Sequence, residues 1–184
     1  VVEELEPRHE VLRASRSSGD IKIDITDKSS IEAAYKEAGN LDAVISTAGK
    51  VKFAPFEELD EEGYEIGLRD KLMGQVNLVL IGRKHLGENG SFTLSTGVLD
   101  QDPIRSGSSA SMVNGAINAF VTAAAIEMPM RQRINAVSSG VIEEAMEAYG
   151  PFFRGFEPVP AARAALAYAK SVEGLRTGQV FRVL

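Results

Sequence analysis

Short apolar runs and helically spaced apolar residues alternate along this sequence, which predicts strands and helices in turn. Runs such as AVIS and INAV lack polar alternation, as is typical of strands buried on both faces. The pattern therefore predicts a doubly wound α/β fold, a parallel sheet with helices on both sides. The predicted strands are residues 10–15, 21–25, 42–48, 91–96, 133–139 and 179–184, and the predicted helices are residues 1–7, 29–39, 60–86, 108–128 and 160–174, with a helical excursion over 141–156.

Two local signals refine the predicted helices. Ser29 with Glu32 three residues later has the spacing of a capping box, so a helix is expected to begin at Ser29. The stretch SASMVNGAINAF repeats apolar residues at helical spacing but carries Asn114 and Gly115 side by side in its middle. Both are poor helix formers, which indicates a reason other than helix stability for keeping them there.

Composition and charge narrow the classes of function. A chain of 184 residues with 44% hydrophobic residues fits one domain over residues 1–184. The net charge of -6, without a Lys/Arg cluster longer than two, disfavours nucleic acid as a partner. The chain has no Cys and two His, so disulfides and metal sites are not expected. No apolar run approaches the roughly 20 residues of a membrane span, and we expect a cytoplasmic protein without a membrane partner.

The helices predicted over 60–86 and 108–128 are apolar on more than one face. LMGQVNLVLIG and GAINAFVTAAAIEM carry apolar or small residues nearly all round, whereas a helix on a sheet needs one apolar stripe. A second copy of the chain is expected to cover the extra face, which gives a homodimer or homotetramer through these helices. The alternative is that they are Ala-rich helices covered by the terminal segment.

The carboxyl ends of the strands, where doubly wound sheets bind ligands, carry ASRSSG, DITD, STAGKV, STGVLD and SSGVIEE. Together with DAVISTAG, KLMG, GSFTLST, INAVSSG and TGQVFRV, in that order, they resemble the short-chain dehydrogenase/reductase family over the whole chain. The resemblance implies a Rossmann-like three-layer α/β/α fold. It also implies an NAD(P)-dependent oxidoreductase that acts on a small-molecule substrate.

The resemblance also predicts what lies before Val1. The family opens with a strand, a Gly-rich turn (GxxxGxG) and a helix, and here only the end of that helix is present. The absent strand would be the central first strand of the sheet, and its loss would leave buried backbone groups unpaired at about 1 to 3 kcal/mol each. We therefore expect roughly fifteen or more further residues, with the Gly-rich loop, upstream in the natural protein.

The positions that the family uses for the cofactor favour NADP(H) over NAD(H). After the second family strand this chain has Ser15, Arg16 and Ser17, and no carboxylate until Asp20. Arg16 with a neighbouring serine can bind a 2′-phosphate, although a solvated loop arginine is the alternative. The resemblance places the other cofactor contacts at Asp24 and Ile25 beside the adenine, at Thr47, Ala48 and Gly49 beside the ribose, and at Asn114, Ser139, Gly140 and Ile142. For Asp24 the alternative is a cap of the next turn.

Two residues near the far end of the expected cofactor site depart from the family. Ser139 stands where the family has Pro, and Glu144 stands where it has Thr. A carboxylate close to a diphosphate would be repelled. Either the excursion turns Glu144 outward, or cofactor affinity is poor.

The usual catalytic residues are all replaced. The family places a Tyr and a Lys one helical turn apart, together with a Ser and an Asn. At those four positions this chain has Ala110, Asn114, Gly97 and Lys71. Lys71 could bring an ammonium into the space at Asn114, as an electrostatic stabiliser or a proton donor. The alternative is a surface lysine paired with a neighbouring carboxylate such as Asp70.

Other side chains could assist a carbonyl substrate. Ser95 and Thr96 offer hydroxyls that can orient the carbonyl. Tyr149 lies on the excursion over 141–158, which covers substrate in the family, and it offers either a phenol or a packed aromatic ring.

Two functions follow from these replacements. The first is an NADPH-dependent reductase with atypical acid catalysis, and the second is a non-catalytic NADP(H)-binding sensor or partner-binding protein.

Overall fold

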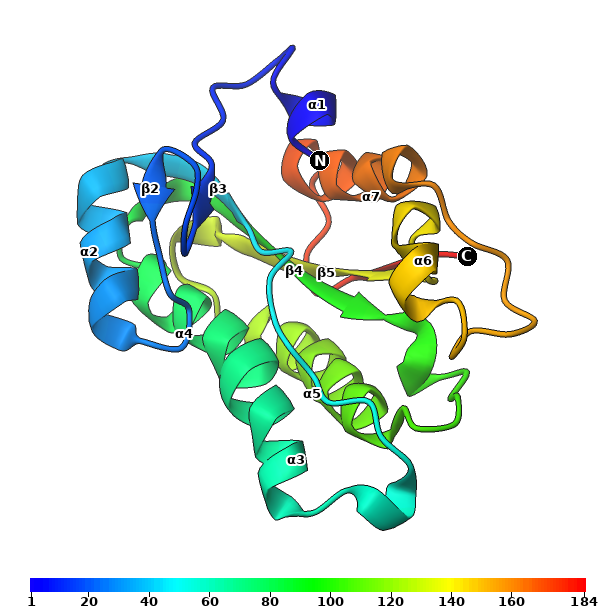
Figure 1. The fold of residues 1–184 in the computed structure, drawn as a ribbon. Coiled ribbons are helices and arrows are strands. Elements are labelled where there is room, and N and C mark those ends of the chain that lie inside the picture. The colour runs from blue at the N-terminus through cyan, green and yellow to red at the C-terminus, as the bar shows by residue number, and fades with distance from the viewer.

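Six strands form two parallel sheets in the computed structural model, which describes residues 1–184. Four of them make one sheet in the order β3-β4-β5-β6, and β1 pairs with β2 in a separate two-stranded sheet (Figure 1). The fold is therefore the predicted Rossmann-like α/β fold. The strands are β1 (Ala14–Ser15), β2 (Ile21–Lys22), β3 (Leu41–Ile45), β4 (Leu86–Gly97), β5 (Arg133–Ser139) and β6 (Val180–Val183).

Helices cover both faces of the four-stranded sheet. In Figure 1, α1 and α7 lie on one face, and α3, α4 and α5 lie on the other. The α-helices are α1 (Val2–Leu5), α2 (Lys28–Ala38), α3 (Glu61–Gly67), α4 (Met73–Gly82), α5 (Ser108–Ala124), α6 (Met146–Tyr149) and α7 (Ala161–Glu173). A π-helical turn, η2 (Leu68–Leu72), joins α3 to α4, and the short 3₁₀ turns are η1 (Phe56–Glu58), η3 (Val98–Asp100), η4 (Pro129–Arg131) and η5 (Glu143–Ala145).

Side chains of β4 alternate between the two helical layers. Phe92 and Leu94 pack with Val113 and Ile117 of α5 in the main apolar core. Thr93, between them, points to the other face, where its hydroxyl lies 2.7 Å from that of Ser171 on α7. This period of two fixes which residues at the carboxyl end of the strand can face α5.

Two helix boundaries differ from the sequence prediction. The predicted capping box at Ser29 is wrong, because α2 begins at Lys28 and Asp27 is its N-cap, accepting a hydrogen bond from Ser29 N at 2.8 Å. The predicted helix over 60–86 does begin after Asp60, which caps α3 through Gly63 N at 2.9 Å. It is not continuous, since the wide turn η2 interrupts it and α4 ends at Gly82.

The strands predicted over 10–15 and 21–25 are shorter than expected, at two residues each. They pair only with each other, at Ala14–Ile21 and Ser15–Lys22, and are not hydrogen-bonded to β3. The strands stay short because a two-stranded sheet without further strands beside it is only marginally stable. None of the helices has the length and apolar character needed to cross a membrane.

Candidate functional site

Lys71 and Asn114 meet between two helices beside the carboxyl end of the sheet. Lys71 Nζ, from η2, donates a hydrogen bond to Asn114 Oδ1 on α5 at 3.0 Å. Asn114 is buried, and so is the ammonium end of Lys71, although that residue as a whole is only partly buried. Burial lowers the pKa of Lys71 to about 8, because the charged form loses hydration. The amine is therefore mostly protonated at neutral pH, yet gives up its proton more readily than an exposed lysine.

Lys71 makes no ion pair. Asp70, its neighbour, accepts hydrogen bonds from Arg16 and from Lys50 N instead. Glu65 pairs with Arg69 along the helix. The alternative of an ion-paired surface lysine therefore does not describe Lys71, whose one polar partner is an amide.

The absence of a side chain at Gly49 leaves room for the aliphatic part of Lys71. Gly49 lies in the loop after β3 with φ +138°, and a Cβ there would come within 2.5 Å of Lys71 Cγ. The side chain of Lys71 thus crosses the loop where a larger residue would block it. Gly49, expected beside a cofactor ribose, is in contact with the lysine that faces Asn114, while Thr47 and Ala48 of the same loop are exposed.

Gly97 leaves space on the other side of the pair. A Cβ at Gly97, the last residue of β4, would lie 3.2 Å from Asn114 Nδ2 and 3.6 Å from Ser139 O. The position where the family has its Ser therefore faces Asn114, but it carries no hydroxyl here.

Ala110, at the family's Tyr position, lies in an apolar cluster one helical turn before Asn114. It is 3% exposed and packs with Val98, Leu99 and the buried Phe153. No phenol is hydrogen-bonded to the pair. An acid for a carbonyl substrate would have to come from Lys71, from Tyr149 of α6, or from water.

The structure brings a tyrosine near the start of α5 that the sequence did not single out. Tyr64 OH on α3 lies 2.9 Å from Ser108 Oγ. The first turns of α3 and α5 lie together, because each helix follows a parallel strand. The spacing of the family's motifs does not predict that Tyr64 and Ser108 come into contact. The hydroxyls of Ser109 and Ser111, buried nearby, have no hydrogen-bond partner.

Ser95, a hydroxyl candidate on β4, is placed away from the Lys71–Asn114 pair. Burial raises the pKa of Tyr168 to about 12, and a hydrogen bond with the Ser95 side chain opposes part of that rise. Since Tyr168 belongs to α7, the Ser95 hydroxyl faces the opposite side of the sheet from α5. Thr96 is buried, and its hydroxyl lies 3.5 Å from Val137 O.

Arg16 is held by two carboxylates. Its Nη2 donates to Asp24 Oδ1 at 2.9 Å and to Asp70 Oδ2 at 3.2 Å, and these hydrogen bonds raise the pKa of Arg16. Its Nε and Nη1 have no partner within the chain, and the side chain is largely exposed. Ser15 and Ser17 border the same shallow hollow, with Ser15 Oγ accepting from Ser17 N at 3.3 Å. One arginine with free donors beside hydroxyls fits a phosphate group.

Asp24 and Ile25 follow that hollow with different roles. Asp24 accepts hydrogen bonds from the hydroxyl and backbone N of Thr26, which lower the pKa of its carboxyl, so it caps the local turn as its alternative proposed. Ile25 is buried, and its side chain occupies the space above Gly74, where a Cβ would come within 2.8 Å. Of these two side chains, only that of Asp24 is therefore exposed to a nucleotide.

Glu144 turns away from the sheet. Its carboxylate accepts hydrogen bonds from Ala161 N, at 3.0 and 3.2 Å, at the first residue of α7. The carboxylate thus stabilises a helix N-terminus. Of the two alternatives for Glu144, the structure shows the outward one.

Ser139, Gly140 and Ile142 lead from β5 into the excursion. Gly140 N donates to Val183 O at 2.9 Å, and Ile142 forms a bridge with Val159. A Cβ at Gly140 would lie 3.1 Å from Val159 Cγ2. The segment is therefore packed against the chain that leads into α7.

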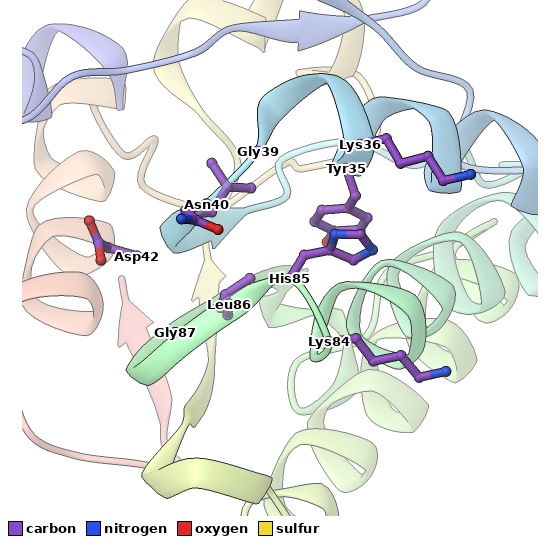
Figure 2. A pocket seen from close by; sticks show the side chains of 10 residues that line it. Tyr35, Lys36, Gly39, Asn40, Asp42, Lys84, His85, Leu86 and Gly87 are labelled. Atoms are coloured by element: carbon purple, nitrogen blue, oxygen red, sulfur yellow. The ribbon is translucent and has the colours of Figure 1, made fainter.

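A second hollow lies at the opposite edge of the sheet, where β3 and β4 begin. Figure 2 shows the ring of His85 lying on that of Tyr35, with ring centroids 5.2 Å apart. The carboxyl ends of α2 and α4 converge there, and such ends carry partial negative charge. Lys36 and Lys84 on the rim offset that charge. The hollow is remote from Lys71 and has no cluster of groups that would hold a cofactor.

Comparison with known proteins agrees with the fold. The family model for enoyl-(acyl carrier protein) reductase matches residues 2–177. An uncharacterized oxidoreductase of Methylorubrum extorquens is 29% identical over 71% of this chain, and the match spans about half (53%) of that relative.

Solved structures are similar as well. The protein lin1944 from Listeria innocua is 48% identical, with a TM-score of 0.98 over 100% of this chain and 92% of that chain. A small-chain dehydrogenase in complex with NADPH is 24% identical, with a TM-score of 0.78 over 88% of this chain and 80% of that chain.

Proposed function

This chain belongs to the short-chain dehydrogenase/reductase family of oxidoreductases, and from that premise we propose that it reduces a small carbonyl compound with NADPH. The observation that carries the proposal is the hydrogen bond from Lys71 Nζ to Asn114 Oδ1 at 3.0 Å. It brings a buried cation to the helix face that the family uses for catalysis. A reductase without the usual Tyr needs such a group.

Lys71 has the chemistry that the reaction requires of the protein. NADPH, when bound beside Arg16, would supply a hydride to the carbonyl carbon, and the carbonyl oxygen would take the electron pair of the broken π bond. The Lys71 ammonium stabilises that oxygen and passes it a proton, so that an alcohol and NADP⁺ result. With a pKa of about 8, Lys71 can regain the proton from water near neutral pH. Asn114 holds the amine through its Oδ1 and retains its amide NH₂ for ribose hydroxyls.

The choice of NADPH rests on Arg16. Its two partner-free donors, Nε and Nη1, and the serines beside it match a 2′-phosphate, although Asp24 and Asp70 must share the guanidinium. The outward turn of Glu144 removes a repulsive charge from the expected diphosphate position. A small-chain dehydrogenase of the same fold has been solved with NADPH.

The test is NADPH oxidation over a broad panel of aldehydes and ketones. We expect turnover by the protein and a fall of roughly 100-fold or more in kcat/KM for Lys71→Ala, within the range of general acid catalysis. Lys71→Arg keeps the charge but not the titration, and is expected to restore part of the activity. Lys84→Ala, an exposed lysine at the opposite edge, is the matched control and should leave kcat/KM unchanged.

A second function is favoured by the closed surroundings of Ala110. Its 3% exposure within an apolar cluster, with no phenol beside it, fits a protein that binds NADP(H) without turnover, a sensor or partner-binding module. Measurable NADPH binding with no oxidation on any carbonyl would favour this function over the reductase.

We also propose that the chain forms a homodimer or homotetramer. Ile66, Met73 and Leu80 on α3 and α4 and Met112 on α5 are exposed apolar side chains on adjoining helices. A second copy would cover them. A cytoplasmic location stays a prediction.

A further inference from the structure

The side chain of Gln75, in the first turn of α4, is hydrogen-bonded to the backbone of β4. Its Nε2 donates to Ser95 O at 2.9 Å, and its Oε1 accepts from Ser95 N at 2.8 Å. Gln75 is fully buried. Because one bond needs a donor and the other an acceptor, the amide has a single orientation here, and it joins α4 to one residue of the strand.

Gln75 takes the place that a neighbouring strand would have at Ser95. β3 stays beside β4 as far as Thr93, whose carbonyl accepts from Ser46 N at 2.9 Å, and then the chain leaves the sheet. Alternate residues of a strand direct their backbone groups to the same neighbour, so Ser95 turns its N–H and C=O to the side that β3 has left. The Gln75 amide satisfies both groups, as the backbone of a strand would. The start of α4 therefore keeps a fixed position against the carboxyl half of β4.

Lys71 lies four residues before Gln75, on nearly the same side of the helical segment. It is hydrogen-bonded to Asn114, which in turn lies against Gly97 of β4. Four residues of helix span about 6 Å, and the two residues of strand from Ser95 to Gly97 span about 6.6 Å. With Gln75 at Ser95, Lys71 is thus level with Gly97, where Asn114 receives its ammonium.

The turn that carries Lys71 is held from both ends. Leu68–Leu72 form the π-helical turn η2, a rare geometry that adds a residue to one turn of a helix. Before it, the segment is pressed against α5, because a Cβ at Gly67 would lie 3.0 Å from a side chain of that helix. After it, the hydrogen bonds of Gln75 hold the segment to β4. Without the second anchor the added residue is free to be lost from the turn, which would rotate Lys71 by about 100° relative to Asn114.

From this arrangement we propose that Gln75 is a positioning residue, which holds the η2 turn through Ser95 and so keeps the Lys71 ammonium at Asn114. Gln75 acts through the backbone, since its own hydrogen bonds go to neither Lys71 nor Asn114. Its value for catalysis rests on the proposed reductase function, in which Lys71 stabilises the carbonyl oxygen. The placing of the amine can be measured without any turnover.

The titration of Lys71 reports its position. ¹³C NMR of protein labelled at lysine Cε follows each amine with pH, and the resonance missing from Lys71→Arg identifies Lys71. In the native protein, burial lowers the pKa of Lys71 to about 8. In Gln75→Leu, which keeps the bulk but neither hydrogen bond, we expect that pKa to rise by about 1 or more, because the amine regains hydration. An unchanged or lower pKa would overturn the proposal.

Gln132 provides a matched control, because it is another buried glutamine whose amide bonds to backbone groups. Its Nε2 donates to Arg83 O at 3.0 Å and to Leu86 O at 2.9 Å, at the end of the sheet where β4 begins. Gln132→Leu should lower the free energy of unfolding, as Gln75→Leu does, but leave the pKa of Lys71 unchanged. An equal rise in both variants would also contradict the proposal. Should Gln75→Leu fail to fold, Gln75→Met, with a flexible side chain and no amide, gives the same comparison.

Failure of the two proposals can be told apart. If the pKa of Lys71 rises in Gln75→Leu alone, while no carbonyl supports oxidation of NADPH, the reductase is removed and the positioning role is kept. If the protein does reduce a carbonyl, Gln75→Leu should lower kcat about tenfold or more and leave the Kd for NADPH unchanged. Undiminished kcat with an unchanged pKa keeps the reductase and removes the positioning role.

Discussion

Lys71 Nζ and Asn114 Oδ1 are 3.0 Å apart, joined across η2 and α5. By resemblance, the family has an Asn where this chain has Lys71 and a Lys where it has Asn114. The amide and the ammonium have thus exchanged helices. The exchange keeps a cation beside this face of α5, but it brings that cation from the neighbouring helix, and the Tyr one turn away is replaced by Ala110.

Burial of Lys71 predicts a pH dependence of stability. The pKa of Lys71 falls from 10.5 to about 8 on folding, so between these values the unfolded chain binds more protons than the folded one. Stability therefore rises with pH across this window, and below it the buried cation lowers the free energy of unfolding by about 1 to 3 kcal/mol. In urea unfolding, the free energy of unfolding of Lys71→Met relative to that of the native protein should be higher at pH 7 than at pH 10. A difference that does not change with pH would contradict this prediction.

The close contact of Gly49 with Lys71 predicts that adding a single methyl group at Gly49 displaces the lysine side chain. Gly49→Ala would place Cβ 2.5 Å from Lys71 Cγ on a backbone with φ +138°. We expect a loss of about 2 to 4 kcal/mol in the free energy of unfolding, from backbone strain and the clash together. Gly39→Ala is the control, because φ is +73° there and nothing lies within 4 Å. It should lose only about 1 kcal/mol, and equal losses in urea unfolding would show that the contact with Lys71 does not matter.

Arg16 predicts the choice of cofactor. Arg16→Ala removes the donors facing the hollow at Ser15 and Ser17, so NADPH should bind about 10- to 100-fold more weakly, as expected for charge-assisted hydrogen bonds. NADH, without the 2′-phosphate, should change little. Titration calorimetry with both cofactors measures this, and Arg13→Ala, an exposed arginine paired with Glu6, is the matched control. An equal loss for NADPH and NADH would remove Arg16 as the phosphate contact.

The hydrogen bond of Glu144 to Ala161 N predicts that removing this carboxylate lowers the stability of the protein without changing its affinity for NADPH. Glu144→Ala removes the acceptor of Ala161 N, and it should lower the free energy of unfolding by about 0.5 to 2 kcal/mol, the range of a lost helix cap. Glu143→Ala, an exposed neighbour, serves as the control in thermal unfolding. The Kd for NADPH should stay the same in both. Tighter NADPH binding by Glu144→Ala would show instead that the carboxylate repels the diphosphate.

The sequence predicted some parts of the molecule well because local signals were enough. The strand over 133–139 coincides with β5, because an apolar run bounded by polar residues marks a buried strand. For Lys71 the sequence left two alternatives open, and the hydrogen bond to Asn114 agrees with the one that brings its ammonium to the Asn114 position.

Other parts depended on neighbours in space. The side of β4 that Ser95 faces follows from Tyr168 on α7, and the partner of Glu144 is a backbone group 17 residues away. The wide turn η2 that carries Lys71 has no sequence signal, because its residues are ordinary helix formers.

The exposed apolar residues of α4 and α5 predict self-association. Met73 and Leu80 lie seven residues apart, close to two helical turns, and Met112 adds an exposed side chain on the adjoining helix. Burying a charge in an apolar contact is costly, so Met73→Glu should shift a dimer or tetramer to monomers in light scattering coupled to size exclusion. Ile126→Glu, 87% exposed beyond the end of α5, is the control and should leave the assembly intact. A monomeric native protein would contradict this prediction and would favour the alternative that the chain's own terminal segment covers these helices.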